Sequence, residues 1–301
     1  MTAERVIVIA LYAAIFASVL TVGFKAHLAE PFFLLRRPGL LIRSFLAMYV
    51  TVPALTVLVL WFVPVPVGVK VGLGLLAISA AMSTTPTQMM ALGASPPYAF
   101  SLVIGMSLLA VITIPLSLAI LTALPLAADG HVPPLELVKV VAINFLVPLA
   151  AGGLFQRMAP RLADRIAEPL SAVAGYLLLA SLAGLLVLNF SGVRGMGVAS
   201  FLVTAGLTVM ALAIGHLLGG PAFGDRAALA IAASSRHTAV AALIATLNSL
   251  GSQTVAIIVV YKIASMLATI PYTKWCQKQL AVRSGKPSEA QRTSPARELA
   301  R

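Results

Sequence analysis

Long apolar segments separated by short polar loops dominate the chain. Each segment has roughly 20 residues or more, the length that an α-helix needs to cross a hydrocarbon layer of about 30 Å at about 1.5 Å per residue. The pattern predicts nine such helices, over residues 6–24, 40–63, 69–93, 98–125, 135–156, 168–189, 196–218, 225–249 and 253–273. The predicted fold class is therefore an all-α polytopic membrane protein with nine transmembrane helices.

Polar residues interrupt two of these apolar segments. Residues 79–87 read SAAMSTTPT, and residues 230–240 read AIAASSRHTAV. Small and hydroxylated residues allow a membrane helix to open locally, which frees backbone groups for a ligand. The two segments are weakly alike and are predicted to run in opposite directions. The sequence thus predicts inverted repeats with two broken helices that cross near the middle of the membrane.

Composition and charge placement support this class. The chain is 60% hydrophobic and 10% charged, whereas soluble proteins carry roughly 25% charged residues. The net charge of +12 could suggest nucleic acid. The cations instead gather in the loops and tail expected in the cytoplasm, where they meet the lipid bilayer and fix the orientation. We expect a bacterial inner-membrane protein with its N-terminus outside, its C-terminus inside and a disordered basic tail over 279–301.

Signatures of enzymes and of metal sites are absent from the sequence. Cys276 is the only cysteine, and the four histidines are scattered along the chain. There is no Gly-rich phosphate loop and no HExxH motif. The sequence therefore predicts no catalytic site, no metal site and no cofactor.

Arg236 is the most informative single residue, because a cation near the middle of a membrane span usually marks a functional site. Two roles are open: its planar fork of donors could bind an anionic substrate, or its fixed charge could stand where a mobile cation would otherwise sit. All nine acidic residues lie in loops, tails or span edges, so none is placed to neutralise Arg236 or Lys262. A bound anion is the simplest compensation for such a buried charge.

The other candidate substrate-binding residues flank the two breaks. Pro86 removes a backbone donor and helps to open the first break, and His237 could carry a proton if transport is proton-coupled. The full set of candidates is Thr84, Thr85, Pro86, Thr87 and Gln88 at the first break, Ser234, Ser235, Arg236, His237 and Thr238 at the second, and Lys262 in the last span.

The nine-span layout, the loop LLRRPG over 34–39 and the two broken segments resemble the bile acid:sodium symporter family. The resemblance covers residues 5–278. It implies alternating access by a core domain, here about 69–125 and 196–278, that moves against a panel domain, here about 5–63 and 135–190. It also implies that the two broken helices cross within the core.

The sodium-binding residues of that family are replaced here. The family's Glu and Gln-Asn pair in the second broken helix fall on Ala232, Arg236 and His237, and its Ser-Asn pair in the first falls on Thr84 and Thr85. Because a cation ligand has become a cation, we expect Arg236 to replace one sodium ion.

The favoured function is a sodium-independent secondary transporter of a small organic anion, by facilitated diffusion, exchange or proton coupling. Two alternatives stay open: a sodium symporter with a site rebuilt from Thr84, Thr85, Gln88 and backbone carbonyls, and a membrane receptor that binds an anion without moving it. The sequence does not fix the substrate, the direction of transport or the oligomeric state, and a homo-oligomer is compatible with it.

Overall fold

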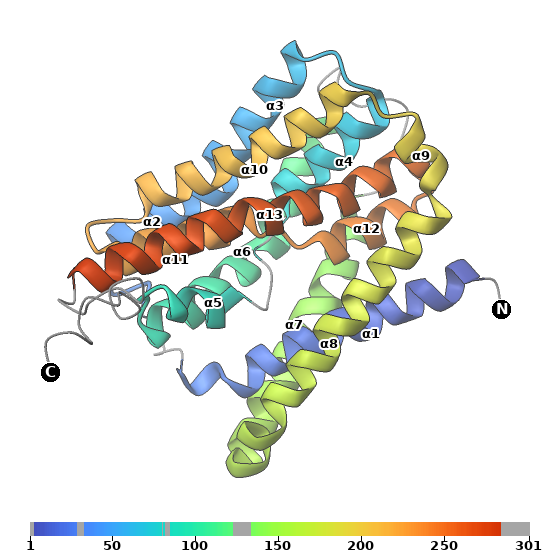
Figure 1. The fold of residues 1–301 in the computed structure, drawn as a ribbon. Coiled ribbons are helices and arrows are strands. Elements are labelled where there is room, and N and C mark those ends of the chain that lie inside the picture. The colour runs from blue at the N-terminus through green and yellow to red at the C-terminus, as the bar shows by residue number, and fades with distance from the viewer. Residues whose placement is uncertain (1–2, 29–32, 80, 82–84, 123–133, 284–301) are drawn as a thin grey trace, which may run out of the picture.

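The computed structural model of the chain describes residues 3–28, 33–79, 81, 85–122 and 134–283 (Figure 1). Every element within these residues is helical. In chain order the elements are α1 (Ala3–Phe24), η1 (Ala26–Leu28), α2 (Pro38–Phe45), the π-helical turn η2 (Leu46–Thr51), α3 (Val52–Phe62), α4 (Val67–Ile78), α5 (Thr85–Ala91), α6 (Pro96–Thr122), α7 (Pro134–Met158), α8 (Pro160–Leu188), α9 (Phe190–Arg194), α10 (Val198–Leu218), α11 (Phe223–Ser234), α12 (Thr238–Leu247) and α13 (Ser252–Arg283).

The helices have the lengths expected of a polytopic membrane protein. Within the described residues, six runs are long and apolar enough to cross a membrane: Ala3–Phe24, Pro38–Phe62, Pro96–Ile114, Pro160–Leu188, Val198–Leu218 and Ser252–Arg283. The predicted third and eighth spans are each divided into two shorter helices, α4 with α5 and α11 with α12. Both breaks were predicted from the sequence, whereas the total of nine spans and the internal repeat stay predictions.

The helices form two groups that touch along a shared face. Helices α1, α7 and α8 pack on one another at the lower right of Figure 1. Helices α4, α6, α10, α11, α12 and α13 form the second group, with α10 against α11 and α13, α13 against α4 and α12, and α6 against α4. The groups meet where α7 contacts α6, where α8 contacts α13 and where α1 contacts α12.

The second predicted span lies in a different group from the one expected. We assigned it to the panel with α1, but η2 and α3 contact α4 and α10 of the second group. Its polar contacts within the described residues explain this position, because they reach α6 and Arg236 rather than α1, α7 or α8. The Tyr49 hydroxyl donates to the Met106 carbonyl of α6, and Ser44 pairs with Tyr98 across 3.4 Å. The division of the whole chain into core and panel stays a prediction.

The first five residues of the predicted disordered tail are helical. Helix α13 continues through residues 279–283, while 284–301 lie outside the described residues. Leu280 explains the extension, since its side chain lies over Gly93 at the end of α5. The Arg283 guanidinium also stacks over the Phe223 ring at 4.6 Å. These contacts hold the last turn against the ends of α5 and α11.

Glycines allow the closest helix contacts, as small residues commonly do in membrane proteins. A Cβ added at Gly152 of α7 would lie 2.4 Å from the Leu20 carbonyl oxygen of α1, and one at Gly23 would lie 2.6 Å from the Leu149 carbonyl oxygen. The α1–α7 crossing therefore depends on the missing side chains at Gly23 and Gly152.

We expect Gly152→Ala to destabilise the protein by about 1–3 kcal/mol, the usual cost of overpacking a tight contact. Gly153→Ala is the matched control, because a Cβ at that neighbouring position meets nothing within 4 Å. Unfolding in detergent, followed by loss of helical signal, measures both variants. Equal stability of the two would contradict the proposed close contact between α1 and α7.

Candidate functional site

The two broken segments meet at their breaks. Ala81 and Arg236 form an isolated antiparallel β-bridge, so the backbone of one break pairs with the backbone of the other. On one side of this point α4 contacts α12, and on the other side α5 contacts α11. The broken helices therefore cross, and each half-helix packs against a half-helix of the other segment.

Arg236 fastens this crossing with its side chain. It is 1% exposed, and among the described residues it is the largest side chain that is fully buried. One terminal nitrogen donates to the Ser79 carbonyl oxygen at 2.9 Å, and the other donates to the Met48 carbonyl oxygen at 3.0 Å. Three segments that are distant in sequence are thereby joined by one guanidinium group.

Both acceptors are backbone groups released by irregular helix geometry. Ser79 follows the last residue of α4, where helix carbonyls lose their usual partners. Met48 lies in the π-helical turn η2, and such turns often occur at functional positions. Because the guanidinium satisfies both carbonyls, and their partial negative charge in turn stabilises the cation, the charge and the freed acceptors compensate each other.

The end of α11 is satisfied in a comparable way by α13. The Ser234 carbonyl oxygen accepts hydrogen bonds from the Tyr261 hydroxyl and from the Ser265 hydroxyl, each at 3.0 Å. Side chains therefore hold freed carbonyl groups of both broken segments. The crossing is buried, in contrast to the cavities beside it.

His237 and Thr238 begin α12 on the other side of the break. The His237 carbonyl accepts the amides of Val240 and Ala241 at 3.1 and 3.2 Å, which starts the new helix. The imidazole is 2% exposed and presents an edge contact to the Phe145 ring of α7, with centroids 5.0 Å apart. His237 thus lies where the crossing touches the α1–α7–α8 group.

A cavity of about 470 Å³ lies beside the crossing, between α5 and α13. Its volume falls within the range of about 300–1,000 Å³ that is usual for small-molecule sites. Lys262, Ser265, Thr269, Thr273 and Gln277 line it at spacings of three or four residues, so they form a polar stripe along α13. Thr85 and Gln88 of α5 and Ser235 of the second break complete its polar lining.

A second cavity of about 530 Å³ opens between the two helix groups. Lys25, Glu168 and Ser171 line it from the α1–α8 side, and Thr87, Gln88, Lys262 and Met266 line it from α5 and α13. Gln88, Lys262 and Met266 belong to both cavities. The two cavities therefore adjoin at Lys262.

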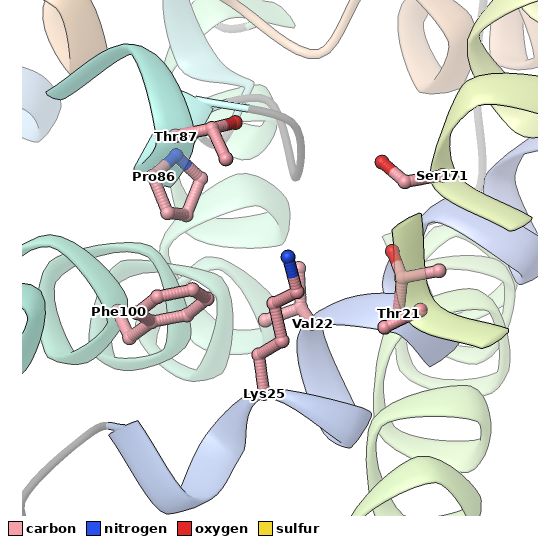
Figure 2. Close-up of a pocket in the computed structure, with 8 residues that line it drawn as sticks. Thr21, Val22, Lys25, Pro86, Thr87, Phe100 and Ser171 are labelled. Carbon is pink, nitrogen blue, oxygen red and sulfur yellow. The ribbon is translucent and has the colours of Figure 1, made fainter. Parts of the chain in front are cut away.

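Figure 2 shows a small pocket of about 30 Å³ at the same boundary. Lys25 extends from the end of α1 into the space between Pro86 and Thr87 on α5 and Ser171 on α8. Its own backbone amide still donates to the Thr21 carbonyl at 3.2 Å, so the last helical turn of α1 orients the lysine. Lys25 is thereby held at the boundary between the helix groups.

Comparison with known families agrees with this architecture. A profile of the sodium bile acid symporter family matches residues 8–196, from α1 to the end of the α9 region. The chain belongs to the sodium bile acid symporter family. No curated protein matches it with significance. The family consists of transporters rather than enzymes, and it indicates a multi-pass membrane transporter of the bile-acid or organic-anion type.

The match to the symporter family ends before α10, so it does not include Arg236 or the rest of the second break. The departure at Arg236 therefore concerns a part of the chain on which the family match is silent. What Arg236 does must be argued from its contacts.

The structure separates the predicted site residues into two sets. Ser234, Arg236, His237 and Thr238 are buried within the crossing, each at most 2% exposed. Thr85, Thr87, Gln88, Ser235 and Lys262 line the two larger cavities, and Pro86 lines the small pocket. Thr84 lies outside the described residues. The side chain of Arg236 lines neither of the larger cavities, which favours the second of its two proposed roles.

Sequence reasoning missed several residues of the site. Met48 contributes a backbone carbonyl, which has no sequence signature. Lys25 was counted only as a loop cation that fixes topology. Ser265 could have been found, because it lies three residues after Lys262 and therefore on the same face of the last helix.

We expect Arg236→Met to destabilise the protein by about 2–6 kcal/mol, since it leaves two buried carbonyl groups unsatisfied at about 1–3 kcal/mol each. Arg226→Met is the matched control. That exposed arginine also donates to a backbone carbonyl, Gly220 at 2.7 Å, but water can replace the bond. The free energy of unfolding of each variant, measured in mixed micelles, compares the two. A loss at Arg236 no larger than at Arg226 would contradict its fastening role.

Proposed function

We propose that the protein is a sodium-independent secondary transporter of a small organic anion, in which Arg236 takes the place of one sodium ion. The observation that carries this proposal is the pair of hydrogen bonds from Arg236 to the Ser79 and Met48 carbonyl oxygens. Unwound backbone carbonyls at broken helices are the groups that coordinate sodium in many transporters. Here a covalently attached cation occupies such groups.

The neighbouring side chains support the same reading. Ala232, which stands where the resemblance places a sodium-binding glutamate, is fully buried, and its side chain carries no oxygen. The side-chain hydrogen bonds of Arg236 to Ser79 and Met48 go to neutral carbonyls, so the crossing already holds one net positive charge. A sodium ion added there would experience repulsion at short range, which is strong where water is excluded.

The substrate in this proposal binds in the two adjoining cavities rather than at Arg236. Lys262 supplies the attracting charge, and Gln88, Ser235 and Ser265 supply hydrogen-bonding groups around it. The cavities lie between the helix groups and beside the crossing, so relative motion of the groups would expose the bound anion to one side of the membrane and then to the other. His237 remains the candidate for any proton coupling.

Counterflow into proteoliposomes tests this function. Vesicles that contain the purified protein are loaded with one unlabelled organic anion at a time from a panel. They are then mixed with a trace of the labelled anion outside, in matched sodium and potassium buffers. We expect equal uptake in both buffers, because no sodium ion is required. Lys262→Met should abolish it, while Lys70→Met, on α4 and outside both cavities, should retain it.

Each other outcome has a definite meaning. Uptake that requires sodium would replace the proposal with a sodium symporter. Anion binding without any counterflow would indicate a receptor. Full activity of Lys262→Met would remove Lys262 from the substrate site.

A further inference from the structure

We propose that the turn between α7 and α8 binds the headgroup of an anionic phospholipid. The site lies apart from the two larger cavities, so it does not depend on the proposed function. In Figure 1 this turn projects at the bottom of the molecule, beyond the ends of the other described helices. Two features that occur together there define the partner: exposed arginines and exposed apolar side chains.

Three exposed arginines surround the turn. Arg157 lies in the last turn of α7, and Arg161 and Arg165 lie in the first two turns of α8. Because Arg161 and Arg165 are four residues apart, they lie on the same side of α8. The planar guanidinium group donates two parallel hydrogen bonds to phosphate oxygens, which makes arginine a frequent phosphate ligand. The turn therefore offers three groups of the type that recognises a phosphodiester.

Exposed apolar side chains accompany the arginines. Leu154 and Met158 of α7 are 59% and 77% exposed, and Leu162 of α8 is 50% exposed. Met158 and Leu162 directly follow Arg157 and Arg161 in the sequence. Cations beside large apolar side chains suit the boundary where lipid headgroups meet acyl chains. A free phosphate would contact only the arginines, whereas a phospholipid would also cover the apolar side chains.

The two acidic residues of this segment have positions that leave the arginines facing outward. The Asp164 carboxylate accepts a hydrogen bond from the Gln156 side chain of α7 at 3.4 Å. Glu168 lines the cavity of about 530 Å³ between the helix groups. Among the residues that the structure describes, neither acid forms an ion pair with the three arginines. The turn therefore presents a positive surface to its surroundings.

Four arginines elsewhere on the described surface differ, because their guanidinium groups contact other parts of the chain. These contacts are Arg37 over the Phe33 ring, Arg194 over the Phe190 ring, Arg283 over the Phe223 ring and Arg226 with the Gly220 carbonyl oxygen. Within the described residues, no hydrogen bond, ion pair or ring contact engages Arg157, Arg161 or Arg165. Their guanidinium groups are accessible to an external phosphate.

The base of the turn packs against the end of α1. The Phe155 ring of α7 contacts the Phe24 ring of α1, with centroids 5.3 Å apart. Ala163 and Ala167 of α8 are fully buried in the same cluster. A lipid bound at the turn would therefore attach the whole α1–α7–α8 group to the membrane surface.

Thermal stabilisation of the purified full-length protein in a non-ionic detergent measures lipid binding, because a ligand that binds only the folded state raises the melting temperature. The probes are phosphatidylglycerol, phosphatidylcholine with the same acyl chains, and glycerol phosphate without acyl chains. We expect only phosphatidylglycerol to raise the melting temperature in a titration. Its effect should weaken as the salt concentration rises, because salt screens exposed charges.

Variants assign the binding to the three arginines. Replacement of Arg157, Arg161 and Arg165 together by glutamine should weaken phosphatidylglycerol binding roughly a hundredfold, since each basic residue near an anionic lipid contributes a factor of about five. Replacement of all three by lysine should weaken it by no more than about tenfold, because the charge is kept while the planar fork is lost.

A matched variant controls for the loss of three positive charges. Arg5, Arg36 and Lys278 are also exposed but lie elsewhere on the molecule. Their combined replacement by glutamine should leave phosphatidylglycerol binding at the wild-type level. Without lipid, both triple glutamine variants should melt close to the wild type, because all the replaced side chains are exposed.

Unchanged phosphatidylglycerol binding in the variant without the three arginines would overturn the inference. So would equal stabilisation by phosphatidylcholine, no stabilisation by phosphatidylglycerol, or an equal loss of binding in the control variant. Stabilisation by glycerol phosphate alone would also overturn it, because it would indicate a site for free phosphate rather than for lipid. Counterflow of organic anions is measured separately, so either proposal can fail while the other stands.

Discussion

The guanidinium of Arg236 is the group on which the centre of the fold depends. A break in a membrane helix releases carbonyl and amide groups that neither lipid nor a regular helix can satisfy. Here two such carbonyls, at Ser79 and Met48, receive the two terminal nitrogens of one buried arginine. The buried cation needs hydrogen-bond acceptors, and the buried carbonyls need donors. Removal of either partner would leave the other buried and unsatisfied, which is unfavourable.

The crossing has a buried centre with two cavities beside it. The second break is closed by Tyr261 and Ser265 of α13, which donate to the Ser234 carbonyl. Polar residues of the same helix, including Lys262, line the neighbouring cavity. The buried Arg236 of the crossing, bonded to backbone carbonyls, is thereby separate from Lys262, the cation that would meet a substrate in the cavities.

Side-chain chemistry determined which features the sequence could predict. The clusters of serine, threonine and proline, with Arg236 in mid-span, predicted both breaks, because few other patterns interrupt an apolar run in this way. The acceptors of Arg236 could not be predicted, since backbone carbonyls look alike in every sequence. The position of η2 against α4 and α10 depends on tertiary packing, and Lys25 could not be told from a loop cation until its helix end was placed beside α5.

Binding of radioactive sodium to the purified wild-type protein tests the central claim most directly. Arg236 is proposed to occupy the place of a sodium ion, and Ala232 stands where the family has a carboxylate ligand. Sodium should therefore show no saturable binding, with or without organic anions. Saturable sodium binding that potassium does not displace would contradict the account, because it would mean that the crossing holds a mobile cation in addition to the arginine.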